Sequence, residues 1–129
     1  MTFVGNGNRE VISLDVDNFS PTVESGGVVV IDISAEWCGP CQAFTAVFHE
    51  AAASTEGVVF GHVDTDTQPE LGAAFNVTAI PTVAVMRGGV LIFLHEGSLS
   101  AQALNDVIRQ AKELDPDQVC ASVAGKAAQ

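Results

Sequence analysis

Residues 28–41 read Val-Val-Val-Ile-Asp-Ile-Ser-Ala-Glu-Trp-Cys-Gly-Pro-Cys, an apolar run that leads into two cysteines with Gly-Pro between them. A helical pattern follows, so this order predicts a strand, a turn and a helix. Cys38 would lie at the beginning of the helix, with Cys41 one turn further along and within reach to close a disulfide. Pro40 fits the first turn of a helix, where its missing N–H costs nothing.

This placement predicts the chemistry of the two thiols. The first amides of a helix have no intrahelical partner, and they lower the pKa of a nearby thiol below its usual value of about 8.5. Cys38 is therefore predicted to attack foreign disulfides as a thiolate, and Cys41 to resolve the mixed disulfide that forms.

Two other interpretations of the cysteine pair stay open. A single Cys-x-x-Cys can be half of a zinc site, or it can form a purely structural disulfide. The chain has no second pair of this kind, and no finger-like spacing relates His49, His62 and His95. We therefore favour redox chemistry and expect no metal site.

The composition suits one globular domain. The chain has 129 residues, of which 47% are hydrophobic, and its formal net charge is −11. No stretch is long and apolar enough to cross a bilayer, and residues 1–8 lack the basic and apolar regions of a signal peptide. Because phosphates bind basic patches, we expect neither nucleic acid nor a membrane as a partner. We expect a monomer.

The number and spacing of the cysteines indicate whether the protein works in a reducing compartment. Three cysteines, two of them in one tight motif, do not form a disulfide framework. This usage is typical of a reducing compartment, so we expect a cytoplasmic protein. The third cysteine, Cys120, lies in the tail and is expected to take no part in the chemistry.

Hydrophobic periodicity predicts alternating strands and helices. Strands are expected at residues 10–14, 28–33, 58–63, 82–86 and 90–94. Helices are expected over residues 18–25, 39–55, 67–76 and from 100 onward, with Asp17, Thr67 and Ser100 as N-caps. A turn at residues 87–89 makes the last two strands an antiparallel hairpin. The order βαβαβαββα predicts an α/β fold, with a mixed sheet covered by helices on both faces.

The domain boundaries follow from the same patterns. Residues 1–8 are rich in glycine and asparagine and are expected to be flexible. Residues 9–114 are expected to form the domain. Residues 115–129 are expected to be a tail that contains at most a short extra helix.

Asp32 is the polar residue in the middle of the most apolar strand. With helices on both faces of the sheet we expect its carboxyl group to be buried, which raises its pKa. It would then lie beneath Cys41 and take the proton of that thiol, directly or through a water. The alternative is an aspartate at the end of the strand that reaches solvent.

Two further residues have both an ordinary and a functional interpretation. Pro81 can simply be the first residue of a strand, or the Ile80-Pro81 bond can be cis and leave the backbone of Ile80 free to pair with an extended substrate. His62 can be a packed or surface residue. Alternatively, it is a titratable partner whose protonation is coupled to that of Asp32.

Several short strings resemble the thioredoxin family in order and spacing. They are Asp32, Ala35-Glu36-Trp37-Cys38-Gly39-Pro40-Cys41, Asp64-Thr65-Asp66, Ile80-Pro81-Thr82, Arg87-Gly88-Gly89 and Gly97. The match runs from about residue 11 to residue 114. A Trp-Cys-Gly-Pro-Cys string with a downstream Ile-Pro-Thr is far more specific than Cys-x-x-Cys alone.

The resemblance implies a thioredoxin fold, in which four helices flank a mixed five-stranded sheet. It implies a protein-disulfide reductase without a bound cofactor, recharged by a thioredoxin reductase that draws on NADPH. Cys38 would attack the disulfides of target proteins, Cys41 would resolve, and Asp32 would accept the proton. Pro81 would be the cis proline. The groove for the target would be lined by Trp37, Gly39, Pro40, Ile80, Pro81 and Gly97.

Some residues depart from the family pattern. Ser34 stands where a second aromatic residue is usual, and His62 where a lysine usually neighbours the buried aspartate. Thr65 and Glu96 make the groove more polar. We therefore keep as an alternative a specialised exchanger that serves one partner and is poorly served by the standard reductase. A third alternative is a binding module whose dithiol holds a metal or regulates a partner.

Overall fold

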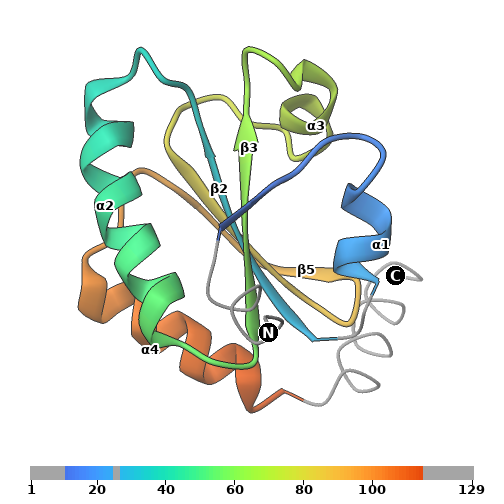
Figure 1. Cartoon of the computed structure of the whole chain (residues 1–129), viewed down its shortest axis with the longest axis vertical. Helices are drawn as coiled ribbons and strands as arrows, with labels where there is room; N and C mark the ends of the chain where they lie inside the picture. The colour runs from blue at the N-terminus through green and yellow to red at the C-terminus, as the bar shows by residue number, and fades with distance from the viewer. Residues whose placement is uncertain (1–10, 25–26, 115–129) are drawn as a thin grey trace, which may run out of the picture.

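The computed structural model describes residues 11–24 and 27–114. Their order is βαβαβαββα, as predicted (Figure 1). The elements are β1 Val11–Ser13, α1 Phe19–Val23, β2 Val28–Ser34, α2 Gly39–Ser54, β3 Val58–Asp64, α3 Pro69–Ala74, β4 Thr82–Arg87, β5 Val90–Glu96 and α4 Ala101–Lys112. The predictions for residues 1–8, the tail 115–129 and Cys120 lie outside the described residues.

The five strands form one mixed sheet in the order β1-β3-β2-β4-β5. β1, β3 and β2 run parallel, while β4 runs antiparallel to both β2 and β5. β2 is a central strand, and all seven of its residues are buried, which explains its unbroken apolar run. The prediction of a mixed sheet is confirmed.

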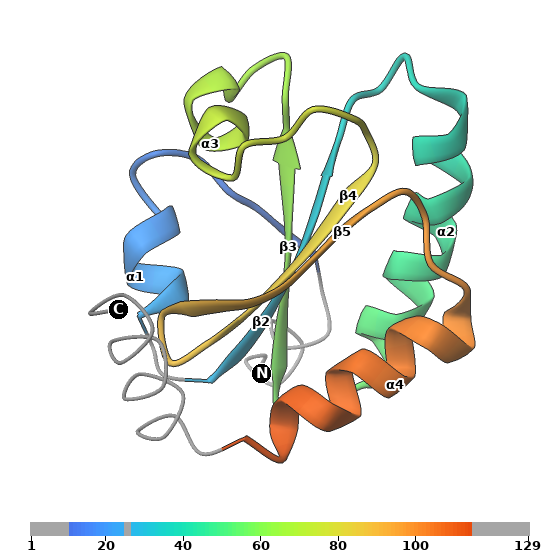
Figure 2. The same cartoon turned by 180° about the vertical axis from the view of Figure 1, so that it is seen from behind.

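Helices cover both faces of the sheet, α2 and α4 on one side and α1 and α3 on the other (Figures 1 and 2). Alternation along β2 divides the core accordingly. Val28 and Val30 pack in the cluster that contains Phe48 of α2. Val29 and Ile31 pack in the cluster that contains Leu71 of α3 and Phe75 just after it. Even-numbered side chains of β2, Asp32 included, therefore face the layer of α2 and α4.

Two of the three predicted helix caps are wrong. Asp17 does not cap α1, because Asn18 is the N-cap and makes no capping bond with its side chain. The acidic residue that organises this turn is Asp15, whose Oδ1 accepts the N–H groups of Asp17 and Asn18, both at 2.8 Å. Thr67 does not cap α3 either, since Gln68 is its N-cap. In both places the turn before the helix supplies the first bonds, so the helix begins later than predicted.

The third predicted cap is confirmed at α4, where the Ser100 hydroxyl accepts the Ala103 N–H at 3.1 Å. We expect Ser100→Ala to lower the free energy of unfolding by about 1 kcal/mol, because a backbone donor of the first turn loses its partner. Urea denaturation measures this difference. Ser98→Ala, at an exposed position outside the helix, is the control and should change stability by less than about 0.5 kcal/mol. Equal losses in the two variants would contradict the capping role.

Candidate active site

The two cysteines lie where β2 passes into α2, and they form a disulfide. Cys38 is the N-cap of α2 in an extended conformation, and Cys41 lies in the first turn with a Cα–Cα distance of 5.2 Å between the two. Both are nearly buried, with exposed fractions of 6% and 1%. Within residues 11–24 and 27–114, no group of three or more His, Cys, Asp or Glu side chains could hold a metal ion.

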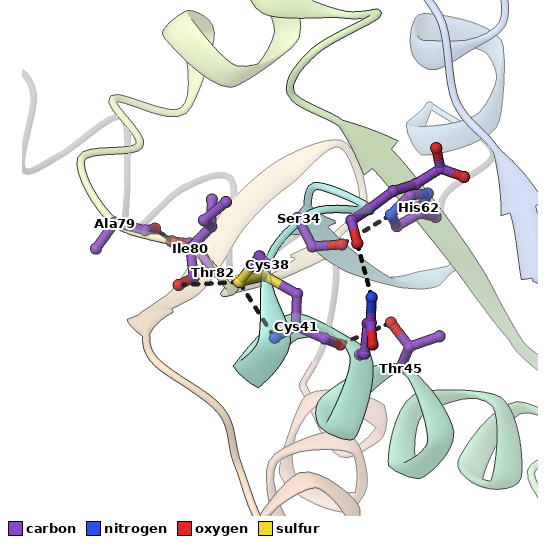
Figure 3. Close-up of a disulfide and its surroundings, with 10 residues drawn as sticks. Ser34, Cys38, Cys41, Thr45, His62, Ala79, Ile80 and Thr82 are labelled. Atoms are coloured by element: carbon purple, nitrogen blue, oxygen red, sulfur yellow. Dashed lines mark hydrogen bonds between the residues drawn. A yellow bond between two sulfur atoms is a disulfide. The ribbon is translucent and has the colours of Figure 1, made fainter.

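The start of α2 directs a backbone donor at the Cys38 sulfur. The Cys41 N–H points at Cys38 Sγ, with an N–S distance of 3.2 Å (Figure 3). Pro40 occupies the first turn, and the Gln42 N–H donates to the Cys38 carbonyl at 3.2 Å, which begins the helical ladder. Once the disulfide is reduced, this donor and the helix dipole stabilise negative charge on Cys38 Sγ. The other cysteine, Cys41, is buried.

The segment around Pro81 lies against the disulfide. The Ile80-Pro81 peptide bond is cis, as predicted. The Ile80 carbonyl oxygen is 4.0 Å from Cys38 Sγ, and Figure 3 shows Ile80 beside that sulfur. The Gly97 N–H donates to the Pro81 carbonyl at 2.7 Å, which ties the end of β5 to this turn. Gly97 adopts a φ of 103°, a conformation that favours glycine.

Other residues predicted for the groove surround the disulfide on the surface. Trp37 is 71% exposed, which is unusual for so large an apolar side chain. Gly39 and Pro40 are exposed at the tip of α2. Thr78 donates a hydrogen bond to the Glu96 carboxylate, so a polar pair connects the Pro81 turn to the end of β5.

Asp32 is buried in the sheet with an exposed fraction of 1%, so the alternative of a carboxylate that reaches solvent at the strand end is wrong. It lies between His62 of β3 and Val83 of β4 in register. Its Oδ1 atom is buried without a hydrogen-bond partner among the described residues. Burial raises the pKa of this carboxyl from 3.8 to about 7, and hydrogen bonding from the Ser34 side chain partly offsets the rise.

His62 is half-buried on β3, and its Nε2 lies 2.8 Å from Ser34 Oγ (Figure 3). Burial lowers the pKa of His62, and the nearby carboxylate of Asp64 opposes this change. The partner of this imidazole is thus Ser34, which sequence reasoning had noted only as a departure from the family pattern. One signal was available, because Ser34 follows Asp32 by two positions on the same strand and therefore shares its face.

Comparison with known proteins identifies the family of this chain. The thioredoxin family model matches residues 10–110. The chain belongs to the thioredoxin family. Thioredoxins are protein-disulfide oxidoreductases, and the paired cysteines at the start of α2 make this chain an enzyme of that kind.

Individual relatives agree with this assignment. A protein named putative thioredoxin 2 from Streptomyces coelicolor is 46% identical over 118 residues, which cover 92% of this chain and 88% of the relative. Thioredoxin C-3 of Corynebacterium nephridii is 37% identical over 102 residues, covering 78% of this chain and 70% of that protein. Among solved structures, a mutant thioredoxin from Halobacterium salinarum superposes with a TM-score of 0.78 at 27% identity, covering 85% of this chain and 97% of that one. The predicted thioredoxin fold is confirmed.

No helix among the described residues of this thioredoxin has the length and apolar character needed to span a membrane.

Proposed function

We propose that this thioredoxin reduces disulfides in target proteins by cycling between a Cys38/Cys41 dithiol and the Cys38–Cys41 disulfide. The observation that carries the proposal is the Cys41 N–H directed at Cys38 Sγ at the beginning of α2. This donor favours Cys38 as the attacking thiolate. Cys41, more deeply buried, suits the role of the resolving thiol.

The cycle transfers two electrons to the target. The Cys38 thiolate attacks one sulfur of a target disulfide, that S–S bond breaks, and the other target sulfur leaves as a thiolate. Cys41 then loses its proton and attacks Cys38 Sγ, which releases the second target thiolate. The enzyme is left with the Cys38–Cys41 disulfide and the target with two thiols.

Asp32 is proposed to accept the proton of Cys41, directly or through a water. Its side chain faces the layer of α2, and its pKa of about 7 suits proton exchange near neutral pH. The protonation of His62 is proposed to be coupled to that of Asp32, because the two residues are in register on adjacent strands and both lie beside Ser34.

The target is proposed to bind across the surface that surrounds Cys38. Trp37 is exposed and the Ile80 carbonyl lies beside Cys38 Sγ, so an extended segment of the target would pair with the Ile80 backbone. The proposed substrate-binding residues are Trp37, Gly39, Pro40, Ile80, Pro81 and Gly97.

Electrons are proposed to come from NADPH through a thioredoxin reductase, without a bound cofactor. The alternative, a specialised exchanger that the standard reductase serves poorly, is favoured by the polar pair Thr78 and Glu96 beside the groove. We further propose a cytoplasmic monomer in which residues 9–114 form the catalytic domain.

An insulin-turbidity assay tests these alternatives. With dithiothreitol as the electron donor, we expect the protein to accelerate precipitation of the insulin B chain, because the dithiol relays electrons faster than dithiothreitol alone. The same assay with a bacterial thioredoxin reductase and NADPH then tests recharging. Activity in both arms supports the proposed function, and activity with dithiothreitol alone supports the specialised exchanger. Inactivity in both arms would contradict the reductase proposal.

A further inference from the structure

A cavity of about 430 Å³ opens between the sheet and α2, next to the active site. Its polar lining includes Asp32, Ser34 and His62 from the sheet and Gln42 and His49 from α2. Asp32 is the deepest of these, and its Oδ1 atom is the buried oxygen without a hydrogen-bond partner among the described residues. A polar cavity of this size can hold water against that carboxyl.

Ser34 stands between the carboxyl and the imidazole. Its side chain lies on the same face of β2 as that of Asp32 and lines the same cavity, and its Oγ lies 2.8 Å from His62 Nε2. A hydroxyl has one hydrogen, so when it donates to the Asp32 carboxylate its oxygen accepts the Nε2–H of His62. When Asp32 is protonated, both bonds can reverse direction. The three side chains thus lie in series along the cavity, with the Ser34 hydroxyl bonded to the imidazole and on the same strand face as the carboxyl.

The outer end of this series reaches solvent-accessible space on two sides. His62 is half-buried and lines both the first cavity and a second one of about 320 Å³. The titratable groups that face this imidazole are Asp15 after β1, Glu36 after β2, Asp64 on β3 and His49 on α2.

We propose that Ser34 and His62 act through Asp32, by carrying its proton to solvent. This inference rests on the proposed role of Asp32 in the disulfide reductase. The Asp32 O–H donates its proton to Ser34 Oγ, and the hydroxyl hydrogen of Ser34 passes to the neutral Nε2 of His62. The imidazole then releases its Nδ1 proton to water. No electrons move, and the hydroxyl is regenerated with the hydrogen that came from Asp32.

Electrostatics around His62 suit this task. Burial and the nearby His49 lower its pKa, while Asp64 and Glu36 raise it, and burial is the largest of these effects. An imidazole whose pKa lies below its ordinary 6.5 is mostly neutral near pH 7, so Nε2 is free to accept a proton and the ring gives it up again readily.

Release of the two thiol products from a disulfide reagent tests the relay. Reduced enzyme that reacts with 5,5′-dithiobis(2-nitrobenzoate) frees one chromophore when Cys38 attacks and a second when Cys41 resolves. Near pH 6 Asp32 is mostly protonated and must lose its proton before it can serve Cys41. We expect Ser34→Ala and His62→Gln to slow the second release about three- to tenfold at that pH, and to leave the first release within about twofold. Near pH 8.5, where Asp32 is already ionised, the slowing should disappear.

Two variants and one additive provide the controls. Ser34→Thr keeps the hydroxyl and should keep the second rate. His49→Gln removes an imidazole from the same cavity and should change that rate by less than about twofold, because burial affects the pKa of His62 more than His49 does. Added imidazole should restore the rate of Ser34→Ala, because the cavity can admit a small base. The relay is overturned if Ser34→Ala resolves normally near pH 6, or if His49→Gln is slowed as much as His62→Gln. Loss of the first release in the wild-type enzyme would instead contradict the proposed function.

Discussion

Replacement of Cys38 by serine is expected to abolish disulfide reduction. The nucleophile must be a thiolate, and a serine hydroxyl at the same helix N-terminus stays protonated at neutral pH and cannot form a disulfide with the target. Turnover in the insulin assay should therefore fall to the rate of dithiothreitol alone, a loss of at least about a thousandfold in the enzyme's own contribution.

Cysteine variants elsewhere separate this effect from a general loss of thiols. Cys120→Ser removes the remaining cysteine and should keep full activity. Cys41→Ser keeps the attacking thiolate but cannot resolve, so it should accumulate a covalent complex with the target that mass spectrometry detects and dithiothreitol releases. Survival of turnover in Cys38→Ser, or its loss in Cys120→Ser, would show that the wrong sulfur has been assigned as the nucleophile.

Asp32→Asn is expected to stabilise the oxidised protein at alkaline pH. The folded state holds the Asp32 proton up to about pH 7, whereas the unfolded chain releases it near the ordinary pKa of 3.8. The folded state therefore binds more protons between these values, and the free energy of unfolding falls as the pH rises through that window. Each pKa unit corresponds to about 1.4 kcal/mol, so the penalty for ionised Asp32 above pH 7 is about 4 kcal/mol.

Asparagine has the same shape as aspartate and carries no charge at any pH, so the penalty should be absent in this variant. Denaturation in guanidinium chloride should show Asp32→Asn more stable by up to about 4 kcal/mol near pH 8, and nearly equal to the wild type near pH 4. Asp66→Asn, at an exposed turn position, is the control and should change stability by less than about 0.5 kcal/mol at both pH values. If the free energies of unfolding of Asp32→Asn and the wild type depend on pH in the same way, the pKa of Asp32 is not raised in the folded state.

Patterns within the sequence were enough to predict the framework of the fold. The apolar run of β2 indicated a buried strand, and hydrophobic periodicity indicated a helix over residues 39–55. Both were confirmed. The caps at Asp17 and Thr67 were wrong because several polar residues stand before each helix. Which of them bonds to the backbone depends on how the preceding turn is folded, and in the first turn it is Asp15.

The candidate active site, too, was predicted only in part. The position of Cys38 at a helix N-terminus, the disulfide to Cys41 and the burial of Asp32 were all predicted. The bond between Ser34 and His62 was not, because the two residues are 28 positions apart and meet only through the register of β2 and β3. The cavity beside them depends on the spacing between α2 and the sheet, which no local pattern encodes.

Local patterns in the chain were sufficient for the order of elements and the dithiol at the strand–helix junction. These depend on residues within a strand or a few helical turns of one another, where periodicity and helix-terminal chemistry act directly. The packed fold was needed to establish that Asp32 Oδ1 has no hydrogen-bond partner among the described residues, that Ser34 bonds to His62, and that Gly97 bonds to the Pro81 turn. Those contacts join segments far apart in the chain, so they exist only once the strands have paired and the helices have packed on the sheet.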